Sequence, residues 1–186
     1  MLILLDLDGV LADFERGFIL AWQRAYPGLA TVAFEDRINF HLAEDYPEAQ
    51  RPLAQALMTA PGFISGLPPV PGAIEGYRAL IATGLDVHIC TSPLRVHTHC
   101  VGEKFEWVGR HLGTAAAERM IMTRDKTLVR GDLLIDDRPA LRGTMAPGWR
   151  HILFDAPYNR IVTDKPRMDW SNWRSVLAGE LYHFDR

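Results

Sequence analysis

Two carboxylates, Asp6 and Asp8, stand directly after an apolar run at residues 2–5 and directly before Gly9. Residues two apart in an extended chain point the same way, with their backbones ~6–7 Å apart, so both acids face one place. Like charges held together need a cation, a proton or a reaction to relieve their repulsion. Gly9 lets the chain turn away at once without a side chain to crowd the site. The pattern favours a reactive or metal-binding pair over the alternative, a solvated loop with two surface acids.

Four further short apolar runs also end in polar residues. The runs are residues 87–90, 120–122, 133–135 and 152–154, and their endings are Thr91-Ser92, Thr123-Arg124-Asp125-Lys126, Asp136-Asp137 and Asp155. Runs this short are also compatible with buried helix segments. Helical stretches between several of them favour strands of a βαβ series, whose carboxyl ends share the ligand-binding edge of a parallel sheet. The sequence therefore predicts that carboxylates, a hydroxyl pair and a lysine converge at one edge.

The acidic members of this set suit phosphoryl chemistry. A carboxylate can attack phosphorus and form an aspartyl-phosphate. The negative charge of the phosphoryl group then requires neutralisation, for which Mg²⁺ is suited because it prefers oxygen ligands. Ligands are available from Asp6, Asp136 and Asp137, with the Asp8 carbonyl as a fourth. The Asp8 side chain is positioned to protonate the leaving oxygen and later to activate water.

The uncharged and basic members suit the phosphate itself. Thr91, Ser92 and Lys126 are predicted to contact the equatorial phosphoryl oxygens, where charge spreads in the transition state. Each has a simpler interpretation when taken alone: Thr91-Ser92-Pro93 as an ordinary strand exit, and Lys126 as a solvated lysine. The four histidines at 88, 97, 99 and 111 lack a zinc spacing and are interpreted as surface or helix-face residues.

The composition argues against nucleic-acid-binding, membrane-spanning and disulfide-rich classes of protein. The 186 residues are 48% hydrophobic, which fits one domain with a modest insertion. The net charge of −3 comes without a basic stripe, so we expect no nucleic-acid polymer as partner. No apolar stretch reaches membrane-spanning length, and the first residues do not resemble a targeting signal. Two cysteines, Cys90 and Cys100, are too few for a disulfide framework or a zinc cluster. Cys90 lies in an apolar run and is interpreted as a packed thiol, and we expect a reducing cytoplasm as the location.

The segment between the first two predicted strands is too long for a single crossover helix. Helices are predicted at 14–25, 48–59 and 71–83, and after the second strand at 96–111 and 169–178. We therefore predict an α/β core at residues 1–15 and 68–186, with a small helical cap at 16–67 inserted after the first strand. An insertion at that point lies over the carboxylate edge and could act as a lid. A passive excursion is the alternative.

Four sequence segments together resemble one phosphatase family. The segment at 6–14 (DLDGVLADF) resembles the first motif of haloacid dehalogenase-like phosphatases and, more narrowly, of 5'(3')-deoxyribonucleotidases. The later segments ICTSP (89–93), TRDKT (123–127) and LLIDDRP (133–139) match that family's motifs in order. The EKFEWV segment at 103–108 and the Trp-rich C-terminal helix are also similar, so the resemblance covers nearly the whole chain.

The resemblance implies a Rossmann-like core with a small cap and Mg²⁺-dependent hydrolysis of nucleoside monophosphates. It implies Asp6 as the nucleophile and Asp8 as the general acid and base. The metal ligands would be Asp6, the Asp8 carbonyl and Asp137, with Asp136 beside them. The phosphate would be held by Thr91, Ser92 and Lys126. It also suggests a homodimer.

The implied substrate pocket departs from the family pattern. Arg95 stands where the family tends to have a lysine, and offers a planar fork instead of a point charge. Phe14, Phe40, His41 and Leu42 fall where the family builds its nucleobase pocket. Because His41 replaces a larger aromatic residue, the stacking surface is smaller. Plain packing within the cap is the alternative role for residues 40–42.

Several hypotheses for function follow. The first is a 5'-nucleotidase that favours deoxyribonucleoside monophosphates, and a close alternative is a phosphatase for a small non-nucleotide ester such as a sugar phosphate. A different class is a receiver-like module that is phosphorylated on Asp6 and binds a partner. The role of Asp8 and the long insertion argue against that module. An inactive scaffold is disfavoured because every expected catalytic position is filled.

Overall fold

The computed structural model describes residues 1–94 and 96–184. Within them, six parallel strands form one sheet in the order β3-β2-β1-β4-β5-β6. The strands are β1 (Leu2–Leu5), β2 (Asp86–Thr91), β3 (Ile121–Met122), β4 (Leu133–Asp136), β5 (Arg150–Phe154) and β6 (Arg167–Met168). The central position of β1 explains its apolar sequence, because both faces of a central parallel strand are covered. The predicted α/β class is confirmed.

The four later strands predicted from sequence are confirmed, each within two residues of its bounds. The β6 strand was not predicted, because Arg167–Met168 is not part of an apolar run. Residues 123–132 connect β3 to β4 with only the short 3-10 helix η4 (Lys126–Leu128). Ten extended residues reach ~33 Å, whereas crossing β2 and β1 requires only ~14 Å, so this crossover needs no α-helix.

Six α-helices occur among the described residues. They are α1 (Phe14–Ala25), α2 (Arg51–Met58), α3 (Ala73–Ile81), α4 (Cys100–Leu112), α5 (Thr114–Glu118) and α6 (Trp173–Phe184). The α1 helix has the predicted bounds and begins at Asp13, whose side chain accepts the Arg16 N–H at 2.9 Å. Both α4 and α6 begin four residues later than predicted. Before α6, the Asp169 carboxylate accepts the N–H groups of Ser171 and Asn172 in a turn, which delays the helix.

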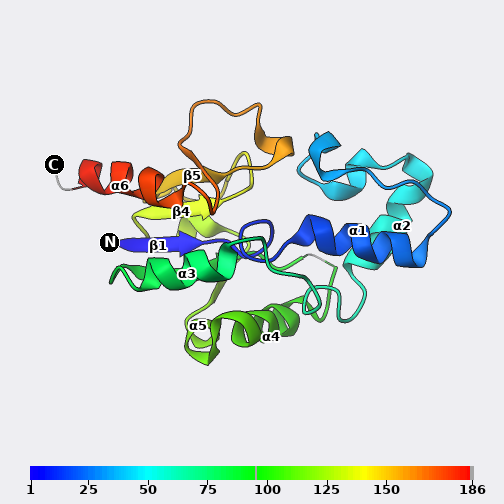
Figure 1. The fold of residues 1–186 in the computed structure, drawn as a ribbon, viewed down its shortest axis with the longest axis horizontal. Helices are drawn as coiled ribbons and strands as arrows, with labels where there is room; N and C mark the ends of the chain where they lie inside the picture. Colours follow the sequence, from blue (N-terminus) through cyan, green and yellow to red (C-terminus); the bar gives the residue numbers. More distant parts are fainter. Residues whose placement is uncertain (95, 185–186) are drawn as a thin grey trace.

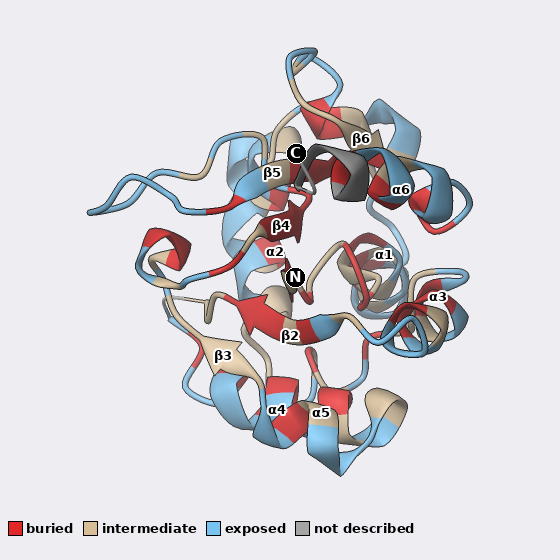
Figure 2. Ribbon diagram, turned by 90° about the vertical axis from the view of Figure 1, so that its left-hand side faces the viewer, coloured by how far each residue is buried: buried red, intermediate tan, exposed pale blue. Residues whose placement is uncertain are grey.

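The two faces of the sheet are covered differently. Ile3 and Leu5 point to the face that α3, α4 and α6 cover, whereas Leu4 points to the other face, where Cys90 and Trp149 pack. Figure 2 shows these helices gathered on one side of the sheet, with connecting segments on the other. Alternate residues of β1 therefore build both parts of the core, and the strand end at Asp6 is fixed from two sides.

Residues 16–67 contain most of α1, all of α2, and three 3-10 helices. The 3-10 helices are η1 (Phe34–Asp36), η2 (Leu42–Asp45) and η3 (Glu48–Gln50). The segment has its own hydrophobic cluster, formed by Phe18, Trp22, Leu42, Tyr46 and Ala54. Figure 1 shows α1 and α2 beyond the carboxyl end of β1, at the opposite end of the molecule from the two termini. We call residues 16–67 the cap, and its action as a lid stays a prediction.

Among the described residues, none of the helices combines the length and the apolar character that crossing a bilayer would require.

Candidate active site

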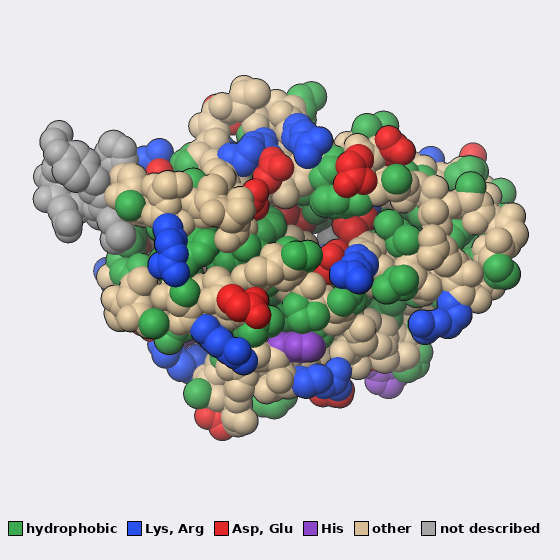
Figure 3. Space-filling view, in the orientation of Figure 1, with side chains coloured by type: hydrophobic (Ala, Val, Ile, Leu, Met, Phe, Trp, Pro, Cys, Tyr) green, Lys and Arg blue, Asp and Glu red, His purple; other side chains and the backbone are tan. Residues whose placement is uncertain are grey.

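Three aspartates from two neighbouring strands meet at the carboxyl edge of the sheet. Asp6, Asp136 and Asp137 each offer a carboxylate oxygen, and these oxygens lie within 4.8 Å of one another. The meeting follows from the β1–β4 pairing: Leu5 is in register with Ile135, and the Asp6 N–H donates to the Ile135 carbonyl at 2.9 Å. In the space-filling view, a hollow between the core and the cap is bordered by acidic side chains (Figure 3).

Lys126 is buried among these acids. Its Nζ lies 2.8 Å from Asp6 Oδ1 and 2.5 Å from Asp136 Oδ2. Burial alone would lower the pKa of Lys126, but the charges of Asp136 and Asp6 raise it above its ordinary value, so the side chain stays cationic. Trp149 Nε1 donates to the Lys126 carbonyl at 3.2 Å and fixes the backbone at this point. The interpretation of Lys126 as a solvated lysine is therefore wrong.

The cluster carries more negative than positive charge, since three carboxylates face one ammonium group. Burial raises the pKa of Asp136 to about 6 although Lys126 opposes the shift. Burial also raises the pKa of Asp137 well above its usual range, and the charges of Asp136 and Asp6 add to the effect. A divalent cation would relieve this repulsion, and a set of carboxylate oxygens is the kind of donor that Mg²⁺ prefers. The residues present therefore fit a magnesium ion.

Gly9 is required by the conformation and by the space beside Asp137. Its φ is +76°, a left-handed conformation that side chains rarely adopt. A Cβ at this position would lie 2.4 Å from Asp137 Oδ2 and 3.4 Å from the Tyr158 hydroxyl oxygen. The turn after β1 can therefore approach the carboxylates only with glycine, as the sequence predicted.

Asp8 is held by a buried lysine that the sequence reasoning missed. Lys104 Nζ donates to Asp8 Oδ2 at 2.7 Å, to Thr91 Oγ1 at 2.8 Å and to the Ser92 carbonyl at 2.9 Å. The Lys104 side chain is fully buried on α4. Asp8 Oδ1 is buried and has no hydrogen-bond partner among the described residues. The EKFEWV segment contained the signal, because a lysine on the inward face of a helix needs acceptors.

Thr91 and Ser92 lie at the end of β2, beside Asp8. Thr91 is fully buried, and its hydroxyl accepts the Lys104 bond while its own proton stays available to a ligand. Lys104 therefore links the Thr91 hydroxyl and the Ser92 carbonyl to Asp8, which places the end of β2 beside that acid. The contact of Thr91 and Ser92 with phosphate stays a prediction.

A second group that the sequence reasoning missed surrounds Asp137. The Tyr158 hydroxyl donates to Asp137 Oδ2, and Asn159 Nδ2 donates to the Asp137 carbonyl at 2.7 Å. Both residues belong to the 3-10 helix η5 (Pro157–Asn159), which follows β5. Burial raises the pKa of Tyr158 well above its ordinary value, as does the Asp137 charge, so the hydroxyl keeps its proton. Because η5 has no apolar periodicity, only its place after a strand could have indicated this role.

The predicted nucleobase residues divide into two groups. Phe40 and His41 form an edge-to-face pair with centroids 5.3 Å apart, and the Arg138 guanidinium carbon lies 5.1 Å from the Phe40 ring centre. Leu42 is instead buried in the cap cluster, and Phe14 packs against Phe63 at 5.3 Å. For Leu42 the structure agrees with the alternative of plain cap packing.

Three further sequence interpretations concern Arg95, His97 and the cysteines. Arg95 lies outside the described residues. The interpretation of His97 as a surface or helix-face residue is wrong, because its side chain is buried beside Glu103 and it precedes α4. Cys90 is a buried free thiol, as predicted, and burial raises its pKa to about 12. Cys100 is also buried.

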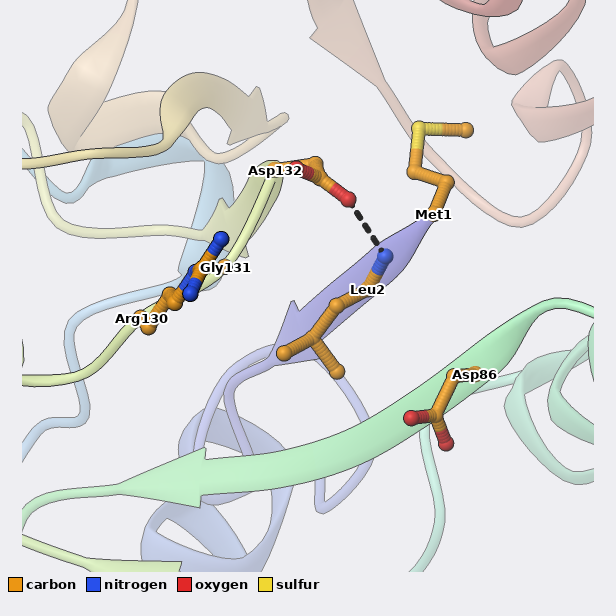
Figure 4. Close-up of a pocket in the computed structure, with 6 residues that line it drawn as sticks. All are labelled: Met1, Leu2, Asp86, Arg130, Gly131 and Asp132. Atoms are coloured by element: carbon orange, nitrogen blue, oxygen red, sulfur yellow. Dashed lines mark hydrogen bonds between the residues drawn. The ribbon is translucent and has the colours of Figure 1, made fainter.

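A separate hollow of about 280 Å³ lies at the amino ends of β1, β2 and β4, the edge opposite the aspartates. Figure 4 shows the Asp132 side chain pointing across this hollow, where its Oδ2 accepts a hydrogen bond from the Leu2 N–H at 2.6 Å. Asp86, which also lines it, pairs with Arg119. These acids are engaged in structural bonds, so we do not place the functional site here.

The fold matches solved structures of one hydrolase class. A haloacid dehalogenase family hydrolase from Deinococcus radiodurans, solved with bound phosphate and sodium, aligns with a TM-score of 0.59 at 20% identity, over 95% of this chain and 94% of its own. A structure from Bacillus subtilis described as a haloacid dehalogenase hydrolase bound to magnesium also aligns with a TM-score of 0.59, at 11% identity, over 95% of this chain and 97% of its own. The sheet with its acidic edge therefore has the haloacid dehalogenase-like fold of these structures.

Sequence comparison narrows the class to one family. Residues 1–179 match the family model described as 5' nucleotidase, deoxy (pyrimidine), cytosolic type C protein. A Bordetella bronchiseptica protein whose name assigns it provisionally to the 5'(3')-deoxyribonucleotidases is 63% identical over 100% of both chains. The human cytosolic 5'(3')-deoxyribonucleotidase is 44% identical over 94% of this chain and 92% of its own. The chain belongs to the 5'(3')-deoxyribonucleotidase family and is a phosphoric monoester hydrolase, which excludes the receiver-like module.

Proposed function

We propose that this chain is a Mg²⁺-dependent 5'-nucleotidase that hydrolyses deoxyribo- and ribonucleoside monophosphates through an aspartyl-phosphate on Asp6. The observation that carries the proposal is the cluster of Asp6, Asp136 and Asp137 around Lys126, at a sheet edge that faces the cap. The human relative at 44% identity is named a cytosolic 5'(3')-deoxyribonucleotidase, which supports a nucleotide substrate and a cytoplasmic location.

Asp6 is suited to the role of nucleophile because its carboxylate is already fixed. Oδ1 accepts the Leu7 N–H at 2.8 Å and contacts Lys126, whereas Oδ2 has no hydrogen bond to another described residue. One carboxylate oxygen would attack phosphorus while the bond from phosphorus to the ester oxygen breaks, which yields the nucleoside and phosphorylated Asp6. Fixed geometry lowers the entropic cost of that attack.

Asp8 is suited to move the proton in both half-reactions. It would give a proton to the departing ester oxygen, and then take one from the water that attacks the aspartyl-phosphate. Lys104 holds Oδ2, so Oδ1 is the oxygen left to face the reacting groups. The same lysine fixes Thr91, and Thr91, Ser92 and Lys126 are the proposed donors to the phosphoryl oxygens.

The proposed metal ligands are Asp6, the Asp8 carbonyl and Asp137, with Asp136 beside them. Asp136 is less suited to direct ligation because Lys126 occupies Oδ2 and the Arg138 N–H donates to Oδ1 at 2.8 Å. Mg²⁺ bound there would supply positive charge against the phosphoryl oxygens and the attacking carboxylate.

The test is a hydrolysis screen with 5'- and 3'-phosphates of ribo- and deoxyribonucleosides, together with a few sugar phosphates. Phosphate release should require Mg²⁺, should stop with a chelator, and should be fastest with a nucleoside monophosphate. Faster release from a sugar phosphate would support the alternative ester, which the small His41 side chain and the burial of Leu42 favour. No Mg²⁺-dependent release from any nucleotide would reject the proposal.

A further inference from the structure

Tyr158 is immobilised on three sides at the boundary between core and cap. Its hydroxyl donates to Asp137 Oδ2, and its side chain is 7% exposed. The Arg37 guanidinium carbon lies 5.4 Å from the ring centre, and the Phe40 ring meets it edge to face at 5.9 Å. Both of those residues come from the cap, so the hydroxyl is aimed by contacts from two parts of the molecule.

Arg37 is itself fixed, which makes the cap side of this contact rigid. It pairs with Glu15 and Asp45 and donates to the Asn39 carbonyl at 2.8 Å. Its side chain is 1% exposed. A tyrosine ring packed between this guanidinium and an aromatic ring loses little entropy when its hydroxyl bonds to Asp137, because the ring is already held.

On the core side, Asp137 is enclosed. Asn159 holds its carbonyl, Gly9 leaves no free space beside Oδ2, and Tyr158 occupies Oδ2. Oδ1 has no hydrogen bond to any described residue, so it is the oxygen left for a cation. A carboxylate that ligates a metal gains affinity when an outer hydrogen bond fixes its orientation.

We propose that Tyr158 is a positioning residue for the divalent cation, holding the Asp137 carboxylate so that one oxygen faces the position shared with Asp6 and Asp136. The inference rests on the metal site of the proposed function. It also extends that function to the cap, because Arg37 and Phe40 are the residues that keep the Tyr158 ring in place.

The experiment measures Mg²⁺ binding to the whole nucleotide-free protein by titration calorimetry, without reference to activity. Tyr158→Phe keeps the ring and its cap contacts and removes only the hydroxyl. Tyr77→Phe is the matched control, since Tyr77 is also 7% exposed but lies on α3 in the core. We expect the Kd for Mg²⁺ to rise ~10–100-fold in Tyr158→Phe and to stay at the wild-type value in Tyr77→Phe.

A second measurement separates positioning from folding. The metal-free Tm of Tyr158→Phe should fall no further than that of Tyr77→Phe, while the rise in Tm on adding Mg²⁺ should shrink, because stabilisation by a ligand follows its affinity. Saturating Mg²⁺ should then restore most of the kcat, with the KM for nucleotide unchanged.

Two results would overturn the inference, and they are distinguishable. If wild type binds Mg²⁺ and Tyr158→Phe binds it equally well, the positioning role fails while the proposed function stands. If wild type binds no Mg²⁺, the metal dependence of the proposed function fails as well.

Discussion

The catalytic edge and the cap each contain a buried cation between two carboxylates. Lys126 lies between Asp6 and Asp136 in the core, and Arg37 of the cap lies between Asp45 and Glu15, the residue just before the cap. The Arg37 network is self-contained, because the guanidinium group donates to the two acids and to a carbonyl. The core cluster has a third acid, Asp137, for which no lysine or arginine partner occurs among the described residues.

The Asp137 carboxylate is what distinguishes the core cluster, as a candidate metal site, from the structural network around Arg37. The pKa of Asp137 is raised well above its ordinary value by burial and by its acidic neighbours, which signals an arrangement that is unfavourable until a cation arrives. The pKa of Glu15 is also raised by burial, but Arg37 opposes that shift through both charge and a hydrogen bond. Buried ion pairs of the same kind therefore stabilise the cap at Arg37 and leave an excess of negative charge at the core cluster.

The largest expected effect is on the nucleophile. Asp6→Asn should lower kcat by at least ~10⁴-fold, because an amide cannot form the phosphorylated intermediate. Circular dichroism should show an unchanged fold, since the Leu7 N–H can still donate to the amide oxygen. Asp164→Asn, at an exposed position, is the control and should keep wild-type turnover. Substantial activity in Asp6→Asn would remove Asp6 from that role.

Asp8 should have the next largest effect. Asp8→Asn should slow hydrolysis ~10²–10⁴-fold, the range for a lost general acid and base. Rapid-quench measurement should show phosphorylated protein accumulating where loss of the base limits the second step. Lys104→Met tests how the acid is held: kcat should fall while Asp6 is untouched, because Asp8 and Thr91 lose the donor that they share. An unchanged kcat would mean that Lys104 serves packing alone.

The aspartate cluster of the core was largely predictable from sequence, for a physical reason. Buried strands are apolar, their carboxyl ends share one edge, and so Asp6, Asp136 and Asp137 could be brought together without coordinates. The connection at 123–132 was harder to predict, because about ten residues are short for a parallel crossover. Lys104 could be noticed only as a lysine in a helical segment, because its acceptors lie on two different strand ends.

The structure of the cap was much less predictable from sequence. Its three 3-10 helices have no long periodicity, and its rigidity depends on Arg37, whose partners come from α1 and from the end of η2. Tyr158 contacts Phe40 of the cap, and the two residues are 118 positions apart in the chain. No local sequence pattern therefore indicates their contact. Short-range sequence patterns predict strand ends well and side-chain networks between loops poorly.

The cap network should control stability more than chemistry. Arg37→Met would leave Glu15 and Asp45 buried without a cation, and should lower the free energy of unfolding by about 3–5 kcal/mol. Urea denaturation would measure the change, with the exposed Arg24→Met as control. Combining Arg37→Met with Glu15→Gln and Asp45→Asn should recover part of the loss. A loss below 1 kcal/mol in Arg37→Met would show that the network is not what holds the cap.

The smallest expected effect comes from Asp125, which supports Lys126 from outside the cluster. Its carboxylate accepts hydrogen bonds from Thr127 and Thr144, and these lower its pKa to about 2. A pKa lowered by folding contributes stability that is complete above the unfolded value near 4 and is lost as pH falls through 2.

The Tm difference between wild type and Asp125→Asn should therefore be constant from pH 5 to pH 7 and should narrow below pH 4. The exposed Asp36→Asn should show no such difference. A Tm gap that widened on acidification would contradict the sign of the shift, and with it the view that Asp125 acts as an ionised anchor for the segment that carries Lys126.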